Sequence, residues 1–297
     1  MHTAQATSSS APQTWTVLSL IDWASRHLAG LGFDETRLHV ELLLARVLHL
    51  KRLDLYLQFD RPLTSNELAG FKELFKRRLT HEPLQYILGE TEFMGLPIGV
   101  DPTVLIPRPE TELLVEKAIE ELRRSPRESP EVLDIGTGSG NIAIAIAHFV
   151  PNARIVAMDV SPEALATAAR NVERNAVQNI QLVEGNILDG APDVRSFDMI
   201  CSNPPYIPHS EFATLQPEVR DFEPRIASTD EEDGLRFVRA IAAHAAGHLT
   251  ARGSLLMEIG CGQTEEAGKI VSRAGFPQVE VFPDVAGIPR VLHGCLP

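Results

Sequence analysis

The feature that most constrains the fold is an alternation of strand and helix patterns in the second part of the chain. After a predicted helix at Glu110–Arg123, short apolar runs recur and are separated by segments with helical periodicity. We expect strands at Val132–Ile135, Arg154–Met158, Ile180–Val183, Phe197–Ser202 and Ser254–Ile259, and a terminal pair at Val279–Phe282 and Arg290–His293. Such alternation is typical of a mostly parallel sheet with helices on both faces.

The first part of the chain has a different pattern. From Trp15 to about Leu88 it is helical, with predicted helices at Trp15–Ala29 and Asp34–Leu50, the second opened by an Asp cap. The run Thr64-Ser65-Asn66-Glu67 is a capping box that begins a third helix. We therefore expect a disordered tail at 1–14, a helical bundle at 15–90, a hairpin or linker at 91–106 and an α/β domain at 107–297.

A glycine-rich turn follows the first strand of the α/β domain. The run Asp134-Ile135-Gly136-Thr137-Gly138-Ser139-Gly140 lets a ligand approach the backbone at a helix N-terminus. The dinucleotide fingerprint requires Gly at the position of Asn141, so that fingerprint is incomplete. The spacing instead resembles the nucleoside-binding loop of class I S-adenosylmethionine-dependent methyltransferases, which implies that Asp134, Gly136, Thr137, Gly138, Ser139 and Gly140 bind the cofactor.

The next two strand ends supply further candidates for that cofactor site. Asp159 ends the second strand, 19 residues after Gly140, where a carboxylate can accept hydrogen bonds from both ribose hydroxyls. The alternative is that Asp159 only caps the helix that begins near Ser161-Pro162. The third strand ends before Asn186 and Ile187, a position that flanks the adenine in such folds, although many relatives have Asp in place of Asn186.

A segment that we call the Asn-Pro-Pro-Tyr segment, Asn203-Pro204-Pro205-Tyr206, ends the fourth strand. Two consecutive prolines remove two backbone donors, so that the Asn side-chain oxygen and the neighbouring carbonyls remain as acceptors. Tyr206 adds a flat face. This arrangement suits a planar –NH2 group, which would donate both hydrogens and stack on the ring. The alternative is a Pro-Pro turn that only ends a strand.

Charge and composition exclude several classes of function. Residues 1–100 carry 10 Lys and Arg against 11 Asp and Glu, and the remainder carries 17 against 29. The acidic second part disfavours stable nucleic-acid binding, and the basic cluster Lys72, Lys76, Arg77 and Arg78 is interpreted as a solvated helix face. No apolar run is long enough for a membrane span. The three scattered cysteines favour a reducing cytoplasm, and the ten histidines show no ligand spacing, so we propose no metal site.

Together these motifs resemble the HemK/PrmC family, protein-(glutamine-N5) methyltransferases that act on peptide chain release factors. The likeness runs from about Pro83 to Arg290. Besides the glycine-rich turn and the Asn-Pro-Pro-Tyr segment, it includes three runs: Pro83-Leu84-Gln85-Tyr86-Ile87-Leu88-Gly89, Val104-Leu105-Ile106-Pro107-Arg108-Pro109-Glu110-Thr111-Glu112 and Pro217-Glu218-Val219-Arg220-Asp221-Phe222-Glu223-Pro224.

The resemblance implies a fold, a reaction and a partner. The fold is a Rossmann-like class I methyltransferase with a seven-stranded, mostly parallel sheet, preceded by a small helical domain that docks the substrate. The reaction transfers methyl from S-adenosyl-L-methionine, leaving S-adenosyl-L-homocysteine, to the side-chain amide nitrogen of a glutamine. The partners are class 1 release factors with their GGQ motif, and the enzyme is expected to be a cytoplasmic monomer.

The resemblance also assigns roles in the reaction. Asn203, Pro204 and Tyr206 would be catalytic, and Pro205 would join them in binding the substrate. Asn203 would also contact the cofactor. The Asn203 side chain and the Pro204 carbonyl would accept the two amide hydrogens, and Tyr206 would pack on the amide plane. Arg108 and Glu110 either border the cleft or form a helix-capping ion pair. Glu258 is interpreted as structural.

The residues alone are compatible with two other functions. The first is an enzyme that methylates an exocyclic amine of DNA adenine or RNA guanine, because the same acceptors serve those amines. The acidic second part and the absence of a recognisable nucleic-acid module weigh against it. The second is a non-catalytic module that retains the fold and binds a translation partner, which a titration with S-adenosylmethionine would distinguish.

Overall fold

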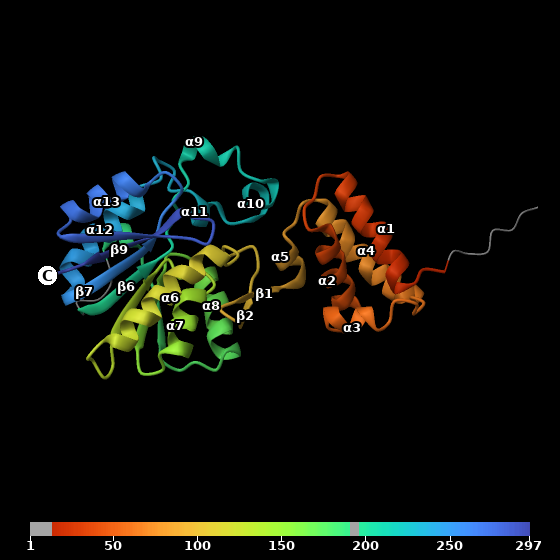
Figure 1. Ribbon diagram of the computed structural model, residues 1–297, viewed down its shortest axis with the longest axis horizontal. Coiled ribbons are helices and arrows are strands. Elements are labelled where there is room, and N and C mark those ends of the chain that lie inside the picture. Colours follow the sequence, from red (N-terminus) through yellow and green to blue (C-terminus); the bar gives the residue numbers. More distant parts are fainter. Residues whose placement is uncertain (1–13, 191–195) are drawn as a thin grey trace, which may run out of the picture. The chain divides into compact units, whose positions relative to one another are not determined.

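The computed structural model describes residues 14–190 and 196–297, which divide into two compact units between Leu88 and Gly89 (Figure 1). The disordered tail expected at 1–14 lies outside the described residues except for Thr14. Within the described ranges, no helix is long and apolar enough to cross a bilayer.

The N-terminal unit is helical, as the periodicity predicts. Its helices are α1 (Val17–Gly30), α2 (Thr36–Leu48), α3 (Arg52–Tyr56), α4 (Ser65–Leu79) and α5 (Leu84–Leu88). Apolar side chains at helical spacing meet in one core, in which Leu28, Leu43 and Leu44 are fully buried. The two short helices α3 and α5 were not predicted, because five residues are too few to show a periodicity.

The helix caps of this unit confirm one prediction and correct another. Thr64 caps α4 as expected, since its backbone N–H donates to the Glu67 carboxylate and its hydroxyl accepts from the Glu67 N–H. Asp34 does not cap α2. The N-cap is Glu35, which has a φ of 46° and makes no side-chain cap hydrogen bond. The chain enters α2 through this left-handed residue, so Asp34 stands one position too early to cap.

The basic cluster on α4 is only partly a solvated face. Lys76 pairs with Glu73, and Arg77 pairs with Glu82, both on the exposed surface. Arg78, by contrast, is 1% exposed, and its guanidinium lies 4.5 Å from the centre of the Phe33 ring. The prediction was therefore wrong for Arg78, which is part of the interior of this unit and stabilises it through a cation–π contact.

The second unit opens with the expected hairpin. Strands β1 (Glu90–Phe93) and β2 (Leu96–Gly99) pair in antiparallel fashion. Met94 and Gly95 between them both have positive φ, which matches the two-residue turn that fits the twist of such a hairpin.

A seven-stranded sheet forms the centre of the second unit, as the resemblance implies. In spatial order it is β5 (Ile180–Glu184), β4 (Arg154–Asp159), β3 (Glu131–Ile135), β6 (Phe197–Ser202), β7 (Leu249–Glu258), β9 (Pro289–Cys295) and β8 (Gln278–Pro283). All neighbours are parallel except that β9 runs antiparallel to both β7 and β8. The last parallel strand is longer than predicted and begins at Leu249.

Helices cover both faces of this sheet (Figure 1). One face carries α6 (Pro109–Arg124), α7 (Asn141–Phe149) and α8 (Pro162–Arg174), and the other carries α12 (Arg236–His248) and α13 (Thr264–Arg273). Four short elements follow strand ends: η1 (Ile187–Asp189), α9 (His209–Phe212), α10 (Pro217–Phe222) and α11 (Arg225–Ser228). The loops after parallel strands all leave at the carboxyl edge of the sheet, where ligands of open α/β sheets bind.

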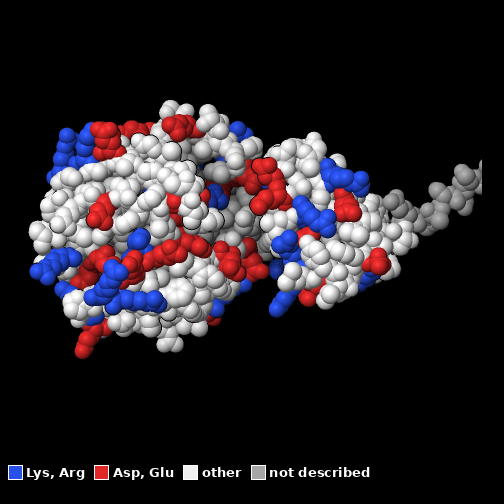
Figure 2. All heavy atoms as spheres, in the orientation of Figure 1, with Lys and Arg blue, Asp and Glu red and all other residues white. Residues whose placement is uncertain are grey.

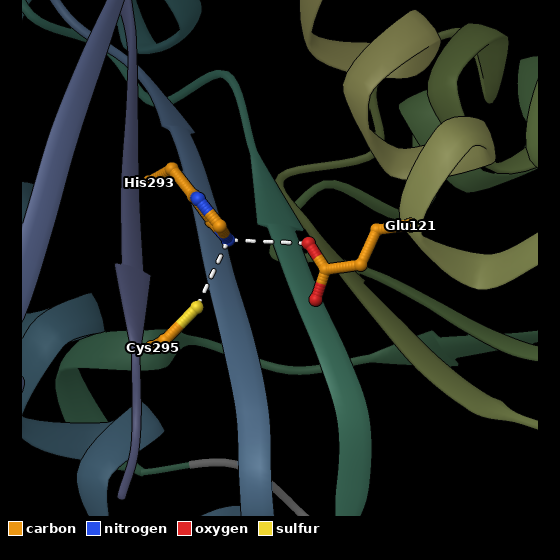
Figure 3. Close-up of side chains that lie close together, drawn as sticks. All are labelled: Glu121, His293 and Cys295. Atoms are coloured by element: carbon orange, nitrogen blue, oxygen red, sulfur yellow. Dashed lines mark hydrogen bonds and ion pairs between the residues drawn. The ribbon is translucent and has the colours of Figure 1, made fainter. Parts of the chain in front are cut away.

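One polar cluster ties α6 to β9 away from that edge. Figure 3 shows Glu121 from α6 beside His293 and Cys295 from β9. His293 Nε2 lies 3.1 Å from Glu121 Oε2 and 3.3 Å from Cys295 Sγ. His293 and Cys295 stand two residues apart in a strand and so share a face, whereas no spacing in the sequence connects them with Glu121. The contact gives each of the three groups a hydrogen-bonding partner.

Asn171 on α8 connects the hairpin to the glycine-rich turn. Its side-chain amide donates to the carbonyls of Gly99 (2.9 Å) and Ser139 (2.8 Å), and its oxygen accepts from the Gly99 N–H (2.7 Å). Asn171 is 2% exposed. One buried side chain therefore pairs with three backbone groups from two separate segments.

We expect Asn171→Ala to lower the free energy of unfolding by about 2–3 kcal/mol, because partly or fully buried backbone groups lose their partner. Urea denaturation measures the loss. Asn175→Ala is the matched control, since the Asn175 amide also bonds backbone carbonyls but does so from a half-buried position. An equal, small loss in both variants would contradict the structural role of Asn171.

Candidate active site

A cavity of about 490 Å³ lies at the carboxyl edge of the sheet, within the second unit. The turn after β3, the ends of β4 and β6 and the loop after β5 all contribute to its wall. Among the predicted cofactor and substrate residues, those that line it are Gly136, Thr137, Gly138, Ser139, Asp159, Asn186, Ile187, Asn203, Pro204 and Pro205. Four strand ends that are far apart in the sequence thus meet around one space.

The glycine-rich turn leaves its backbone open to that space. Gly136 and Gly138 have φ of +72° and +54°, a region that disfavours other residues. A Cβ added to either would meet no protein atom within 4 Å. Because both glycines line the cavity, a ligand can approach the backbone where side chains would otherwise stand. The turn precedes the N-terminus of α7, whose dipole favours polar or negative groups.

Two of the predicted cofactor residues are not part of the cavity wall. Asp134 is fully buried, and one of its oxygens accepts a hydrogen bond from the Thr137 hydroxyl at 2.7 Å. Burial raises the pKa of Asp134 to about 7. Gly140 has a φ of +82°, and a Cβ there would lie 3.1 Å from the Ile144 side chain and 3.3 Å from that of Ala168. Asp134 and Gly140, at the two ends of the glycine-rich run, therefore pack against other protein atoms and set the shape of the turn.

Asp159 lies at the end of β4 with its carboxylate on the cavity wall. One oxygen accepts from the Gly138 N–H at 2.8 Å, and the other accepts from the Ser161 N–H at 2.9 Å. Each oxygen has a further lone pair for a ligand hydroxyl. Burial raises the pKa of Asp159, and the bonds from backbone N–H groups oppose that rise. Ser161, not Asp159, is the side-chain cap of α8.

Asn186 is held locally by its own backbone turn. Its oxygen accepts from the Leu188 N–H, and its amide donates to Asp189, in both cases at 3.0 Å. Asn186 caps η1 in this way and also lines the cavity beside Ile187. Ile187 is 8% exposed and supplies an apolar wall.

The Asn-Pro-Pro-Tyr segment follows β6, and its last residue, Tyr206, is half-buried. Asn203, Pro204 and Pro205 line the cavity, whereas Tyr206 does not appear among the lining residues. The Tyr206 hydroxyl donates to Glu258 at 3.2 Å, and burial raises the pKa of this phenol. The phenol therefore stays protonated near neutral pH and acts as a donor.

A buried chain of hydrogen bonds links Asn203 to Tyr206. The Asn203 amide donates to the Thr111 hydroxyl at 3.1 Å, and that hydroxyl donates to Glu258 at 2.7 Å. The other Glu258 oxygen accepts from Tyr206. Thr111 and Glu258 are each 1% exposed. Neither residue was predicted to be part of the site, since nothing in the sequence pairs the first turn of α6 with the end of β7.

The backbone of Tyr206 is fixed as well. The Gln263 amide donates to the Tyr206 carbonyl at 2.9 Å and to that of Gly234 at 3.2 Å, and its oxygen accepts from the Gly260 N–H. A Cβ at Gly234 would lie 2.5 Å from the Tyr206 carbonyl oxygen. Close packing and a double hydrogen bond thus hold the turn after β6 in one position.

Arg108 pairs with Glu223 and not with its neighbour Glu110. Its Nη2 lies 2.7 Å from both Glu223 oxygens, and Glu223 is 6% exposed. The ion pair between Arg108 and Glu110 that we considered is therefore not formed, and Glu223 takes the place of Glu110 as the partner of Arg108. Burial raises the pKa of Glu223, and the Arg108 charge opposes the rise. Arg108 itself lines the cavity, so the pair joins the start of α6 to the end of α10 at the cavity wall.

Two family models match the sequence of this chain. They are the PrmC N-terminal domain, over residues 19–89, and the methyltransferase small domain, over residues 109–217. The release factor glutamine methyltransferase of Geobacter sulfurreducens is 46% identical over 283 residues, which cover 95% of this chain and 98% of that protein. The chain belongs to the release factor glutamine methyltransferase family.

Other relatives agree with this family. The release factor glutamine methyltransferase of Chlorobaculum tepidum is 42% identical over 291 residues, covering 94% of this chain and 97% of that protein. A solved methyltransferase from Pyrococcus furiosus superposes with a TM-score of 0.50 at 20% identity, over 78% of this chain and 98% of that one, which supports the fold alone. The family and the methyltransferase fold that the motifs imply are both confirmed.

Proposed function

We propose that this chain methylates the side-chain amide nitrogen of a glutamine in a class 1 peptide chain release factor, at the GGQ motif. The names of its relatives in the family support this activity. The observation that carries the proposal is the shared cavity: Asn203, Pro204 and Pro205 line the same space as the glycine-rich turn and Asp159. A methyl donor and an amide acceptor would therefore meet at one edge of the sheet.

The cavity suits S-adenosylmethionine as the methyl donor. The open backbone of the glycine-rich turn, the Asp159 carboxylate and the apolar Ile187 side chain offer partners for the polar, ribose and adenine parts of such a molecule. Asn186 would stand beside the adenine, although its side chain is already bonded to its own turn. When bound, the cofactor supplies a methyl group on a positively charged sulfur.

The residues of the chain act on the amide. A glutamine amide nitrogen is a weak nucleophile, because its lone pair is delocalised into the carbonyl. The Asn203 oxygen and the Pro204 carbonyl would accept its two N–H hydrogens, which orients the nitrogen and stabilises the positive charge that develops on it. Tyr206, held through its hydroxyl and its backbone carbonyl, would pack against the amide plane. Proximity and orientation supply the remainder of the rate.

The charge of the second part supports a protein substrate over a nucleic acid. Residues 101–297 carry a net charge of −12, from 17 Lys and Arg against 29 Asp and Glu. On the face shown in Figure 2, Lys and Arg lie next to Asp and Glu. Lys117 and Arg124, for example, both pair with Glu120. A phosphate backbone requires clustered cationic side chains. We propose that the enzyme is a cytoplasmic monomer without a stable nucleic-acid partner.

The direct test is incubation of the protein with labelled S-adenosylmethionine and, in parallel, with a release factor, the same factor with its GGQ glutamine replaced by alanine, and duplex DNA. We expect label on the intact factor only. Label on DNA would favour the alternative function in base methylation. Cofactor binding without transfer to any acceptor would favour a non-catalytic module.

The helical unit is proposed to dock the protein substrate. We expect a variant that begins near residue 90 to bind S-adenosylmethionine within about three-fold of the full chain, because the described residues that line the cavity all belong to the second unit. Its KM for an intact release factor should rise strongly, whereas its kcat/KM for a short GGQ peptide should stay near normal. Circular dichroism confirms folding first. A normal kcat/KM for the intact factor would contradict the docking role.

A further inference from the structure

We propose that Thr111 is a positioning residue that fixes which end of the Asn203 amide faces the substrate, with Glu258 setting the direction of the hydrogen bonds. This inference rests on the proposed function. It concerns the first turn of α6, which carries Thr111, and the end of β7, where Glu258 also holds the Tyr206 hydroxyl.

Glu258 accepts hydrogen bonds from both hydroxyls of this network. Burial raises the pKa of Glu258, and the hydrogen bonds from Thr111 and Tyr206 and the Arg290 charge oppose that rise. In its ionised form this carboxylate only accepts hydrogen bonds, so both hydroxyls that contact it donate. The Thr111 hydroxyl lies 2.7 Å from one oxygen and the Tyr206 hydroxyl 3.2 Å from the other. A threonine hydroxyl has a single proton. Because Thr111 gives that proton to Glu258, its oxygen can only accept from any further partner.

That further partner is Asn203. The amide atom that lies 3.1 Å from the Thr111 oxygen must be a donor, and therefore it is the –NH2 group. The carbonyl oxygen of Asn203 is then turned away from Thr111 and is free to accept from a substrate amide. If the amide were flipped, its carbonyl would oppose a second acceptor, and a donor would meet the donor groups of the substrate. The hydrogen-bond direction thus selects the productive orientation.

The geometry makes Thr111 suited to this task. It is 1% exposed, so water does not compete for its hydroxyl. Its branched Cβ restricts the side-chain rotamer, which fixes the hydroxyl position. A helical threonine hydroxyl often bonds a carbonyl in the preceding turn, but here it bridges to residues 147 and 92 positions away. Polar networks that are buried and fully paired are rigid, so the orientation of Asn203 is held before the substrate arrives.

The experiment compares Thr111→Val, which keeps the shape and removes the hydroxyl, with Thr111→Ser, which keeps the hydroxyl. The readout is single-turnover methyl transfer to a release factor at saturating S-adenosylmethionine. We expect Thr111→Val to slow transfer by about 10-fold or more while the cofactor Kd changes less than about two-fold. Thr111→Ser should stay within about three-fold of the unaltered protein.

A double variant separates positioning from general structural support. The proposal requires that Thr111 affects transfer through Asn203 and not through its bond to Glu258, so Thr111→Val combined with Asn203→Ala should be no slower than Asn203→Ala alone. Multiplied losses would overturn the proposal. A Thr111→Val rate within about three-fold of normal would also overturn it, as would equal losses in the Val and Ser variants. If Thr111→Val does not fold, Thr111→Ala takes its place under the same criteria.

Failure of this inference is distinct from failure of the proposed function. The proposed function fails if the unaltered protein binds S-adenosylmethionine and transfers no methyl to the release factor glutamine. The inference fails if the unaltered protein is active and the Thr111 variants show multiplied losses with Asn203→Ala, a near-normal Thr111→Val rate, or equal losses for Val and Ser.

Discussion

Asn203→Ala should slow methyl transfer by at least about 10²-fold and leave cofactor binding nearly intact. The lost oxygen bonds the substrate amide modestly in the ground state and more strongly in the transition state, where nitrogen becomes cationic. The loss of one such preorganised polar group costs about 2.7–4 kcal/mol. Single-turnover transfer with saturating cofactor measures the effect, and calorimetric titration measures the cofactor Kd.

Asn203→Asp is the sharper probe of the same site. It keeps the size and an acceptor, so full activity would follow if acceptor geometry alone mattered. We expect poor rescue. The Asp carboxylate would face the Thr111 oxygen, whose only proton is given to Glu258, and the anchoring N–H bond at 3.1 Å would be lost. Burial of a further carboxylate beside Glu258 is also costly. Near-normal transfer by Asn203→Ala would reduce the Asn-Pro-Pro-Tyr segment to a turn that ends a strand.

Asp159→Ala should weaken S-adenosylmethionine binding by about 1.5–3 kcal/mol, or roughly 10- to 150-fold in Kd, because two charge-assisted bonds to ribose hydroxyls are lost. The carboxylate also accepts from the backbone of Gly138 and Ser161, so a loosened turn contributes to the loss. Calorimetric titration of the folded variant measures the Kd.

Ser161→Ala is the matched control for that experiment. Its hydroxyl accepts from the Ala164 N–H and caps α8, so this variant loses the cap and keeps the carboxylate. We expect a lower stability and a Kd within about three-fold of normal. If Asp159→Ala binds the cofactor as tightly as Ser161→Ala does, Asp159 serves the local backbone alone and holds no ribose.

Much of the fold follows from local pattern. Buried strands such as β6 show a short apolar run, here Met199-Ile200-Cys201, and the Thr64 capping box is complete within four residues. The misses arise where tertiary contact overrides the local rule. Arg78 stands in a basic run that resembles a solvated face, yet Phe33 from another segment covers it. Asp34 precedes a helix, but a left-handed Glu35 separates it from the first turn.

The candidate site divides in the same way. Residues that stand at strand ends could be found, because the carboxyl ends of parallel strands share one edge. Residues that act from behind the wall could not, since Thr111 and Glu258 are 147 positions apart and neither spacing nor residue type connects them. Arg108 was singled out for its position near the cleft, and it does line the cavity. Its partner Glu223 could not be predicted, because it lies 115 residues away, just after α10.

Asn171 couples the β1–β2 hairpin to the glycine-rich turn. Its single amide is shared by the hairpin, through Gly99, and by the cofactor turn, through Ser139. Coupling free energies between two sites are reciprocal. If a partner that distorts the hairpin lowers the affinity of the turn for the cofactor, the bound cofactor must lower the affinity for that partner by the same factor. Asn171 makes the two segments one thermodynamic unit, although they are separated by about forty residues of sequence.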